Sequence, residues 1–408
     1  MYTIDGGITA AKGFKASSCA AGIKYEGRTD MAMIWSDAPC TTAGVYTSNL
    51  VKAACVQWDK AVTASDEKVS AVVINAGIAN ACTGELGLQY CEETAKAVSE
   101  EKGVPVKGVL VASTGVIGKQ LPIEKIVNGT VVLCETLDGS VESGTLASKA
   151  IMTTDTVNKE VAVSFDIGGK TVTMGGMCKG AGMIHPNMCT MLGFITTDCA
   201  IDKKLLQKAL SENVTDTFNM VSVDGDTSTN DTLVVLANGL AENPIVDKEG
   251  ADYETFKAAL FEVMKTLAKK MAADGEGATA MLEVNVVNAK TKEQARVLAK
   301  SVICSSLTKA AIYGHDANWG RILCAFGYSG ETFDPENVTL IFEGGGESIL
   351  IFENGVGTDF SEEKATQILS NKEVKVIADF HMGDASATAW GCDLTHEYVS
   401  INADYRSS

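Results

Sequence analysis

The stretch KGAGMIHPNMCTMLGFITTD (residues 179–198) runs from a glycine-rich loop into an apolar segment that begins at Thr190. Glycine lets a backbone approach another group closely or adopt positive φ angles. The segment from Thr190 onward has the character of a buried strand. Taken alone, the pattern also fits an ordinary surface loop that enters a sheet. It is not a phosphate-binding P-loop, because glycine, lysine and hydroxyl residue stand in the wrong order.

Strands are predicted on both sides of this stretch, from runs rich in Val and Ile. Gly168-Gly169 separates two such runs and predicts a tight hairpin turn. The expected strands cover residues 71–75, 108–113, 161–165, 171–174, 232–238, 282–287 and 374–379.

Helices are predicted between these strands. Apolar residues from Phe256 to Met271 fall at spacings of three and four, which indicates one stripe of a long amphipathic helix. Thr291 with Gln294 forms a capping box ahead of a second helix, and Ser361 begins a third. Mixed strands, hairpins and helices predict a layered α/β (α+β) protein. The glycine signature of a dinucleotide-binding fold is missing from the sequence, which disfavours a Rossmann oxidoreductase.

Composition disfavours several classes of protein. The chain has 408 residues, of which 46% are hydrophobic, so two or three domains with a large core are expected. A net charge of −18 disfavours a nucleic-acid partner. The first residues lack the pattern of a signal peptide, and no apolar run is long enough to span a bilayer. We therefore expect a cytoplasmic protein with no membrane contact.

The twelve cysteines are scattered and form no C-x-x-C pairs. We expect them to be reduced and to pack as small hydrophobic residues. A zinc site is the alternative, but the four histidines show no ligand spacing. The prediction is therefore that the protein binds no metal.

A threonine at the start of a strand can act as a nucleophile if the peptide bond before it is cut. Thr190 would then carry both a hydroxyl and a free α-amine. The amine, with a pKa of about 7.7–8.0, can serve as general base for the hydroxyl. The hydroxyl could also make the cut, by attacking the Cys189 carbonyl in an N-to-O acyl shift, which a strained loop would favour, followed by hydrolysis of the resulting ester by water.

The motif K-G-x-G-M-I-x-P-N-M-x-T-M-L at residues 179–192 closely resembles the processing site of the ornithine acetyltransferase (glutamate N-acetyltransferase) family. The resemblance extends over essentially the whole chain. Two residues depart from the commonest family pattern, Cys189 and His185, both where Ala is frequent, and we expect neither to act in catalysis. The further blocks that resemble the family are residues 41–45, 75–84, 113–118, 152–156, 222–232, 318–321 and 401–406.

The resemblance implies a transfer of acetyl from N-acetylornithine to glutamate in cyclic arginine biosynthesis, through a ping-pong route on Thr190. Thr114 and Gly115 would form the oxyanion hole, on a turn that follows strand 108–113. Self-cleavage between Cys189 and Thr190 would yield an α piece (1–189) and a β piece (190–408). Two copies of each piece are expected to associate as a heterotetramer.

The resemblance also assigns substrate contacts. Lys179 and Glu276 have the charges that an amino acid's carboxylate and amine require. Thr154 remains an alternative to Thr153, because the adjacent pair leaves the register open by one residue. The implied fold is a layered sandwich like that of N-terminal-nucleophile hydrolases, but connected differently. The substrate contacts that the resemblance implies are Thr153, Lys179, Thr190, Glu276, Asn402 and Ser407.

Other functions remain open on the sequence. A self-processing aminopeptidase or amidohydrolase would pass the same Thr ester to water. An unprocessed structural or ligand-binding homologue would never mature. No cofactor is implied, although acetyl-CoA could serve as a second acetyl donor.

Overall fold

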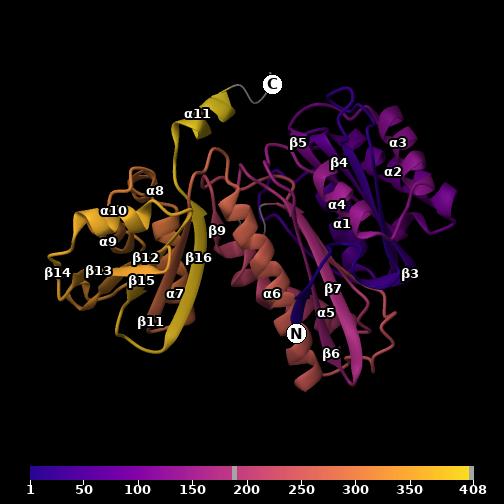
Figure 1. The fold of residues 1–408 in the computed structure, drawn as a ribbon. Helices are drawn as coiled ribbons and strands as arrows, with labels where there is room; N and C mark the ends of the chain where they lie inside the picture. Colours follow the sequence, from indigo (N-terminus) through magenta and orange to yellow (C-terminus); the bar gives the residue numbers. More distant parts are fainter. Residues whose placement is uncertain (186–190, 404–408) are drawn as a thin grey trace. The chain divides into compact units, whose positions relative to one another are not determined.

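The protein is described by a computed structural model that covers residues 1–185 and 191–403. The chain divides into two compact units, the first drawn mainly in indigo to magenta and the second mainly in orange to yellow (Figure 1). Both units contain residues from before and after Cys189, so neither unit corresponds to one expected cleavage piece. The first unit comprises Met1–Gly180, Asn187–Thr215 and Thr227–Leu267, and the second comprises Ala181–Pro186, Asp216–Asp226 and Ala268–Ser408.

The first unit is built on a mixed sheet. Its strands are β1 (Tyr2–Ile4), β2 (Phe14–Cys19), β3 (Met31–Tyr46), β4 (Val69–Ile78), β5 (Val109–Val116), β6 (Lys159–Ile167), β7 (Lys170–Lys179), β8 (Leu192–Thr197) and β10 (Thr232–Ala237). Their order is β1-β6-β7-β8-β10-β3-β4-β5, with β2 also paired to β3. The long strand β3 pairs with β2 and β4 through its first half and with β10 through its second half. The register shift between Trp35 and Cys40 allows this change of partner.

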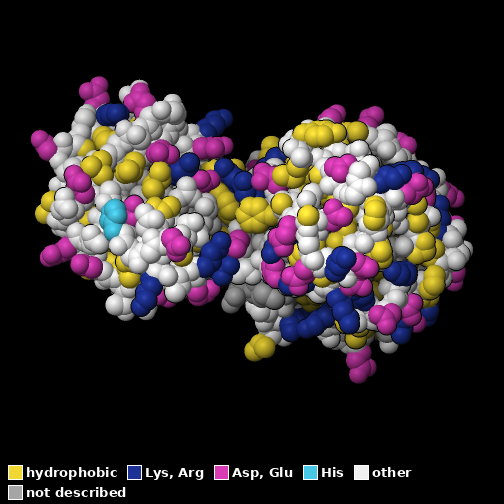
Figure 2. Space-filling view, turned by 90° about the horizontal axis from the view of Figure 1, so that it is seen from below, with side chains coloured by type: hydrophobic (Ala, Val, Ile, Leu, Met, Phe, Trp, Pro, Cys, Tyr) yellow, Lys and Arg dark blue, Asp and Glu magenta, His cyan; other side chains and the backbone are white. Residues whose placement is uncertain are grey.

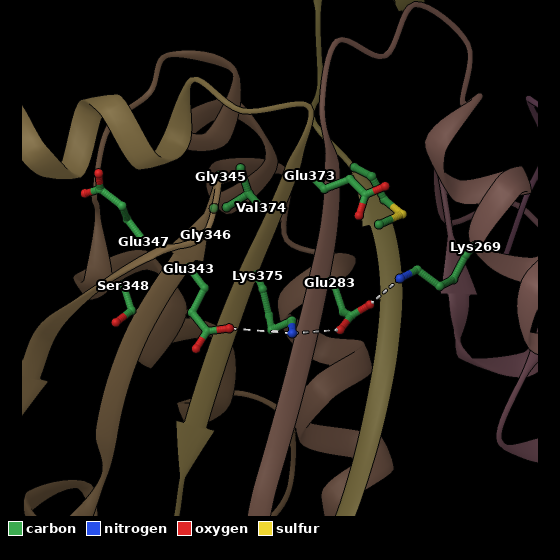
Figure 3. A pocket seen from close by; sticks show the side chains of 12 residues that line it. Lys269, Glu283, Glu343, Gly345, Gly346, Glu347, Ser348, Glu373, Val374 and Lys375 are labelled. Atoms are coloured by element: carbon green, nitrogen blue, oxygen red, sulfur yellow. Dashed lines mark ion pairs between the residues drawn. The ribbon is translucent and has the colours of Figure 1, made fainter.

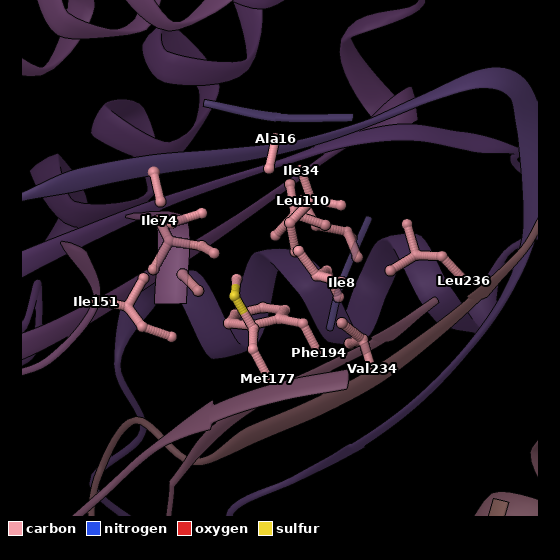
Figure 4. Close-up of a cluster of buried hydrophobic side chains, with 14 of the residues drawn as sticks. Ile8, Ala16, Ile34, Ile74, Leu110, Ile151, Met177, Phe194, Val234 and Leu236 are labelled. Atoms are coloured by element: carbon pink, nitrogen blue, oxygen red, sulfur yellow. The ribbon is translucent and has the colours of Figure 1, made fainter. Parts of the chain in front are cut away.

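The core of the first unit joins both parts of this sheet. Ile34 and Ile74 come from β3 and β4, and Met177, Phe194 and Val234 from β7, β8 and β10, and all five meet in one fully buried cluster (Figure 4). Burial of a large aliphatic or aromatic side chain contributes about 1.5–3 kcal/mol. The helices of this unit are α1 (Ala54–Ala64), α2 (Glu85–Lys102), α3 (Ile123–Glu135), α4 (Val141–Ala150), α5 (Lys203–Thr215) and most of α6 (Ala251–Ala273).

The second unit contains a second mixed sheet, in the order β14-β13-β12-β15-β11-β16-β9. The strands are β9 (Val221–Ser222), β11 (Met281–Ala289), β12 (Thr339–Gly344), β13 (Glu347–Glu353), β14 (Val356–Gly357), β15 (Glu373–Asp379) and β16 (Ala385–Cys392). The helices are α7 (Lys292–Ile303), α8 (Ser306–Tyr313), α9 (Trp319–Gly327), α10 (Glu362–Leu369) and α11 (His396–Ala403). Short 3₁₀ turns lie at Val106–Gly108, Phe218–Met220 and Pro335–Asn337.

The layered α/β fold class is confirmed, and each predicted strand overlaps an observed one. Gly168 and Gly169 form the β6–β7 turn with φ values of 57° and 77°. The Thr291 side chain caps α7 by accepting from Gln294 N–H. The capping box is nevertheless incomplete, because the Gln294 carboxamide accepts from Lys290 N–H instead of Thr291 N–H.

Two of the strand boundaries that differ from the prediction lie next to predicted site residues. The strand expected to begin at Thr190 begins at Leu192, where pairing with β7 and β10 starts. The strand expected to end at Ser113 continues to Val116, because its pairing with β4 extends to the Ile78–Val116 pair. Periodicity alone does not show where a neighbouring strand stops.

The charged surface agrees with the composition of the chain, and the free cysteines agree with the expectation that they are reduced. Acidic side chains are spread among basic ones over the face seen in Figure 2. The eleven cysteines that lie in the described residues are all free. Between residues 1 and 403, leaving out 186–190, no helix is long and apolar enough to cross a bilayer.

Candidate active site

Thr114 and Gly115 lie within β5, opposite Ala76 and Gly77 of β4, and not on a separate turn as predicted. Gly115 has a φ of 129° and Gly77 a φ of 105°, conformations that favour glycine. A Cβ added to Gly115 would lie 2.2 Å from the carbonyl carbon of Gly77. The paired glycines therefore let the two strands stay close in a conformation that other residues would not adopt.

Lys179 is the last residue of β7 and is 8% exposed. Its Nζ donates to Thr114 Oγ1 at 3.3 Å. In the antiparallel ladder Lys179 is the partner of Leu192, and the carbonyl of Met191 accepts from Thr232 N–H at 2.8 Å. The start of β8 is thus fixed beside Lys179. The predicted cut, between Cys189 and Thr190, lies just upstream and outside the described residues.

Asp155 organises this region, although no role could be assigned to it from the sequence. Its carboxylate accepts from Lys159 Nζ at 2.7 Å, from Gly180 N–H at 2.7 Å and from Thr153 N–H at 3.0 Å. Burial would raise the pKa of Asp155, but the charges of Lys179 and Lys159 and these hydrogen bonds outweigh it and hold the pKa at about 2. Asp155 therefore remains ionised and fixes both the Thr153 backbone and the residue after Lys179.

Thr153 lies in the segment between α4 and β6. Its carbonyl accepts from Arg28 Nη2 at 3.2 Å, and its N–H is held by Asp155 as described. The side chains of Thr153 and Thr154 are both partly exposed. The choice between them as a substrate contact therefore stays a prediction.

In the second unit, Glu276 and Asn402 lie in contact. Asn402 Nδ2, on α11, donates to Glu276 Oε2 at 2.7 Å, and Glu276 is 6% exposed. Glu276 N–H donates to the carbonyl of Ala181 at 2.9 Å. A Cβ added to Gly182 would lie 2.2 Å from Glu276 Oε2, so a larger residue there would displace the Glu276 carboxylate. Ser407, the remaining predicted contact from the tail, lies outside the described residues.

Asp224 is a second carboxylate that the sequence did not single out. It accepts from Met183 N–H at 2.6 Å and from Ile184 N–H at 2.9 Å. It also accepts from the Tyr398 hydroxyl of α11 at 3.2 Å. Burial, together with the negative charge of Asp224, raises the pKa of Tyr398. Asp224 therefore links residues 183–184, upstream of the predicted cut, to the C-terminal helix.

His185 packs among polar groups of the second unit. Its Nδ1 lies 3.1 Å from Ser222 Oγ and 3.6 Å from Cys304 Sγ. Burial and the nearby charge of Lys300 lower the pKa of His185 to about 4, against the opposing effect of Asp224. The imidazole is consequently neutral at pH 7.

Two cavities are lined by residues other than the predicted ones. One, of about 390 Å³, opens on the second sheet, where Lys375 lies 3.7 Å from Glu283 and 3.5 Å from Glu343 (Figure 3). The other, of about 550 Å³, is lined in the first unit by residues that include Arg28 and Lys149. No predicted site residue lines either cavity, although Arg28, which lines the second, donates to the Thr153 carbonyl.

The part of the chain that the structure describes holds no group of three or more His, Cys, Asp or Glu placed to bind a metal ion.

The groups that the first unit brings together are compatible with acyl transfer. A buried lysine can neutralise a substrate carboxylate, and a hydroxyl with an adjacent glycine N–H can stabilise an oxyanion. The lysine pairs with the first residue of β8, the strand that follows the predicted nucleophile, and its ammonium reaches the Thr114 hydroxyl. The class of protein that these features indicate is an acyltransferase.

Comparison with known proteins identifies the family. The sequence model described as "ArgJ family" matches residues 15–407. The arginine biosynthesis bifunctional proteins ArgJ of Caldanaerobacter subterraneus and Symbiobacterium thermophilum are 48% and 49% identical, with all of each chain covered. A solved chain of the Bacillus halodurans protein of the same name is 47% identical, at a TM-score of 0.50. It matches 52% of this chain and 98% of its own length. The chain belongs to the ArgJ family, and it is an acyltransferase of arginine biosynthesis.

Proposed function

We propose that the chain cuts itself between Cys189 and Thr190, and that Thr190 then carries acetyl from N-acetylornithine to glutamate. The Thr190 oxygen attacks the acetyl carbonyl carbon and the C–N bond breaks. Ornithine leaves with the proton that the Thr190 α-amine took from the hydroxyl. The glutamate amine then attacks the ester, the C–O bond breaks, and the proton returns to Thr190.

One contact carries this proposal. Lys179 Nζ touches Thr114 Oγ1 at 3.3 Å, and Lys179 pairs with Leu192, two residues after Thr190 in the chain. A carboxylate-binding cation thus lies beside the start of β8, the strand that follows the nucleophile, and in contact with a hydroxyl donor. In the proposal the Thr114 hydroxyl and the Gly115 N–H stabilise the oxyanion of each tetrahedral intermediate.

The substrate contacts follow from charge. Lys179 binds the α-carboxylate that N-acetylornithine and glutamate share. Glu276 binds the side-chain ammonium of the ornithine moiety, and Asn402, which donates to Glu276 at 2.7 Å, holds that carboxylate in place. Thr153 and Ser407 add hydroxyl contacts.

The Bacillus halodurans relative supports the cleavage step. Nearly all of that solved chain is matched by about half of this one, 98% against 52%. Cleavage at residue 189 would produce two pieces that are each about half of the chain. We further propose that two α and two β pieces assemble as a heterotetramer.

The proposal is tested with Thr190→Ala and the matched variant Thr190→Ser. Thr190→Ala should stay uncut and should form no N-acetylglutamate from N-acetylornithine and glutamate. Thr190→Ser keeps a hydroxyl and an N-terminal amine, so it should be cut and retain part of the transfer. Normal transfer by Thr190→Ala would contradict the proposal.

The same assay separates the competing functions. An amidohydrolase would release free acetate at the same rate with or without glutamate. A transferase requires glutamate for turnover. N-acetylglutamate formed when acetyl-CoA is the sole donor would extend the activity to that second substrate.

A further inference from the structure

A buried amide ties together the strand ends that carry the proposed oxyanion donors. Asn230, just before β10, is 5% exposed. Its Nδ2 donates to the carbonyl of Ala79 at 2.5 Å and to that of Ser113 at 2.8 Å. Its Oδ1 accepts from Thr229 Oγ1 at 2.6 Å. One side chain thus binds the carbonyl that directly follows β4 and the carbonyl of the peptide bond before Thr114.

These hydrogen bonds of Asn230 lie next to two glycines, whose backbone has the most conformational freedom. Gly77 and Gly115 face each other between the two carbonyls that Asn230 binds. Glycine populates many backbone conformations, so the orientation of the Thr114–Gly115 peptide must be fixed by its surroundings. A second buried amide, Asn75, contributes: its Oδ1 accepts from Ser113 Oγ at 2.7 Å, and its Nδ2 donates to the Ile78 carbonyl at 2.9 Å.

We propose that Asn230 is the positioning residue of the oxyanion hole. It touches neither substrate nor reacting atoms, and acts by holding the Ser113 carbonyl, so that Thr114 and Gly115 present their donors in one fixed geometry. The inference rests on the proposed role of Thr114 and Gly115. Its physical basis is that donors must be preorganised to act on a transition state, and that a misplacement of about 1 Å can cost about 100-fold in rate.

Asn243 provides a matched control within the first unit. It is 6% exposed, and its Nδ2 donates to the carbonyls of Pro244 at 2.8 Å and Ala200 at 3.2 Å. Its Oδ1 accepts from Ala200 N–H at 2.9 Å. Asn243→Ala therefore removes a comparable set of buried hydrogen bonds from a residue that does not contact β4 or β5 through them.

The experiment compares Asn230→Ala, Asn230→Ser and Asn243→Ala by Tm, kcat and KM for both substrates, with kcat expressed per cleaved chain from intact mass. Both alanine variants should lower Tm. Only Asn230→Ala should lower kcat, by about 100-fold, with KM nearly unchanged. Asn230→Ser, which keeps one short donor, should fall between Asn230→Ala and the wild type. If Asn230→Ala does not fold or is not cut, Asn230→Ser is compared with Asn243→Ala in its place.

Thr114→Ala separates failure of this inference from failure of the proposed function. If Thr114→Ala keeps the wild-type kcat, the oxyanion assignment itself is wrong. If Thr114→Ala loses kcat while the Asn230 variants keep it, or if Asn243→Ala loses as much as Asn230→Ala, only the role of Asn230 is overturned. The double variant Thr114→Ala with Asn230→Ala should lose less than the product of the two single losses, because Asn230 acts through Thr114.

Discussion

Two ammonium groups share one buried carboxylate at the end of β7. Asp155 pairs with Lys159 at 2.7 Å, and both side chains are fully buried. The charge of Lys179 also acts on Asp155. Removing one partner of a buried pair leaves the other charge in a medium of low polarity, which costs far more than the loss of an exposed pair.

Asp155→Asn is therefore expected to destabilise the protein by about 3–5 kcal/mol. Because the pKa of Asp155 is lower in the folded state, its contribution is present above the ordinary carboxyl pKa of about 3.9 and is lost as pH falls through about 2. Thermal unfolding at pH 7 measures the cost. Asp166→Asn, on the exposed β6–β7 hairpin, is the control. An equal loss of Tm in both variants would contradict the account.

His185 gives a pH dependence of its own. Its pKa is lowered to about 4 in the folded state, so its contribution to stability is present above about pH 6.5 and is lost as the pH falls towards 4. The ring is partly exposed, so we expect the contribution to be only about 1–2 kcal/mol. His185→Gln should show a smaller drop in Tm than the wild type between pH 7 and pH 4.5. Equal drops would show that the histidine does not cause the effect.

At the scale of elements, the β4–β5 pair depends on glycine. Gly115→Ala combines a φ of 129° with a Cβ 2.2 Å from backbone of Gly77, and no rotamer relieves a backbone clash. We expect a kcat loss of about 100-fold or more together with a lower Tm. Gly118→Ala is the matched control, since Gly118 also has a positive φ, of 81°, but has nothing within 4 Å of the added atom. Similar kcat values for the two variants would argue against a special role for Gly115.

The elements also show what the sequence could and could not predict. Hydrophobic runs located the strands because burial on both faces leaves a local signal, as in β4 and β10. The roles of Asp155, Asp224 and Asn230 left no such signal. Asn230 and Ser113 are 117 residues apart in the chain, and only the strand order brings them together. Family resemblance supplied the proposed catalytic residues, whereas their buried polar partners required the fold.

At the scale of the whole molecule, the two expected pieces are interleaved. In the first sheet β8 and β10 follow Thr190, and they lie between β7 and β3, which precede it. Separation of the pieces would break the β7–β8 and β10–β3 ladders and expose their shared core.

The pieces should therefore stay together after cleavage. Under native conditions both should elute as one species in size-exclusion chromatography, and they should separate only at denaturant concentrations that unfold the sheet. The measured mass of that species also tests the proposed heterotetramer. Separation of the pieces in plain buffer would contradict the interleaved arrangement.

The central claim is that Thr190, as a new N-terminus, holds the acetyl group between the two half-reactions. Intact mass spectrometry after mixing the protein with N-acetylornithine, without glutamate, tests it most directly. The account predicts a β piece that begins at Thr190 and is heavier by one acetyl group, located on that threonine by fragmentation and removed when glutamate is added. An uncut 42.8 kDa chain, or an acetyl group on any other residue, would contradict it.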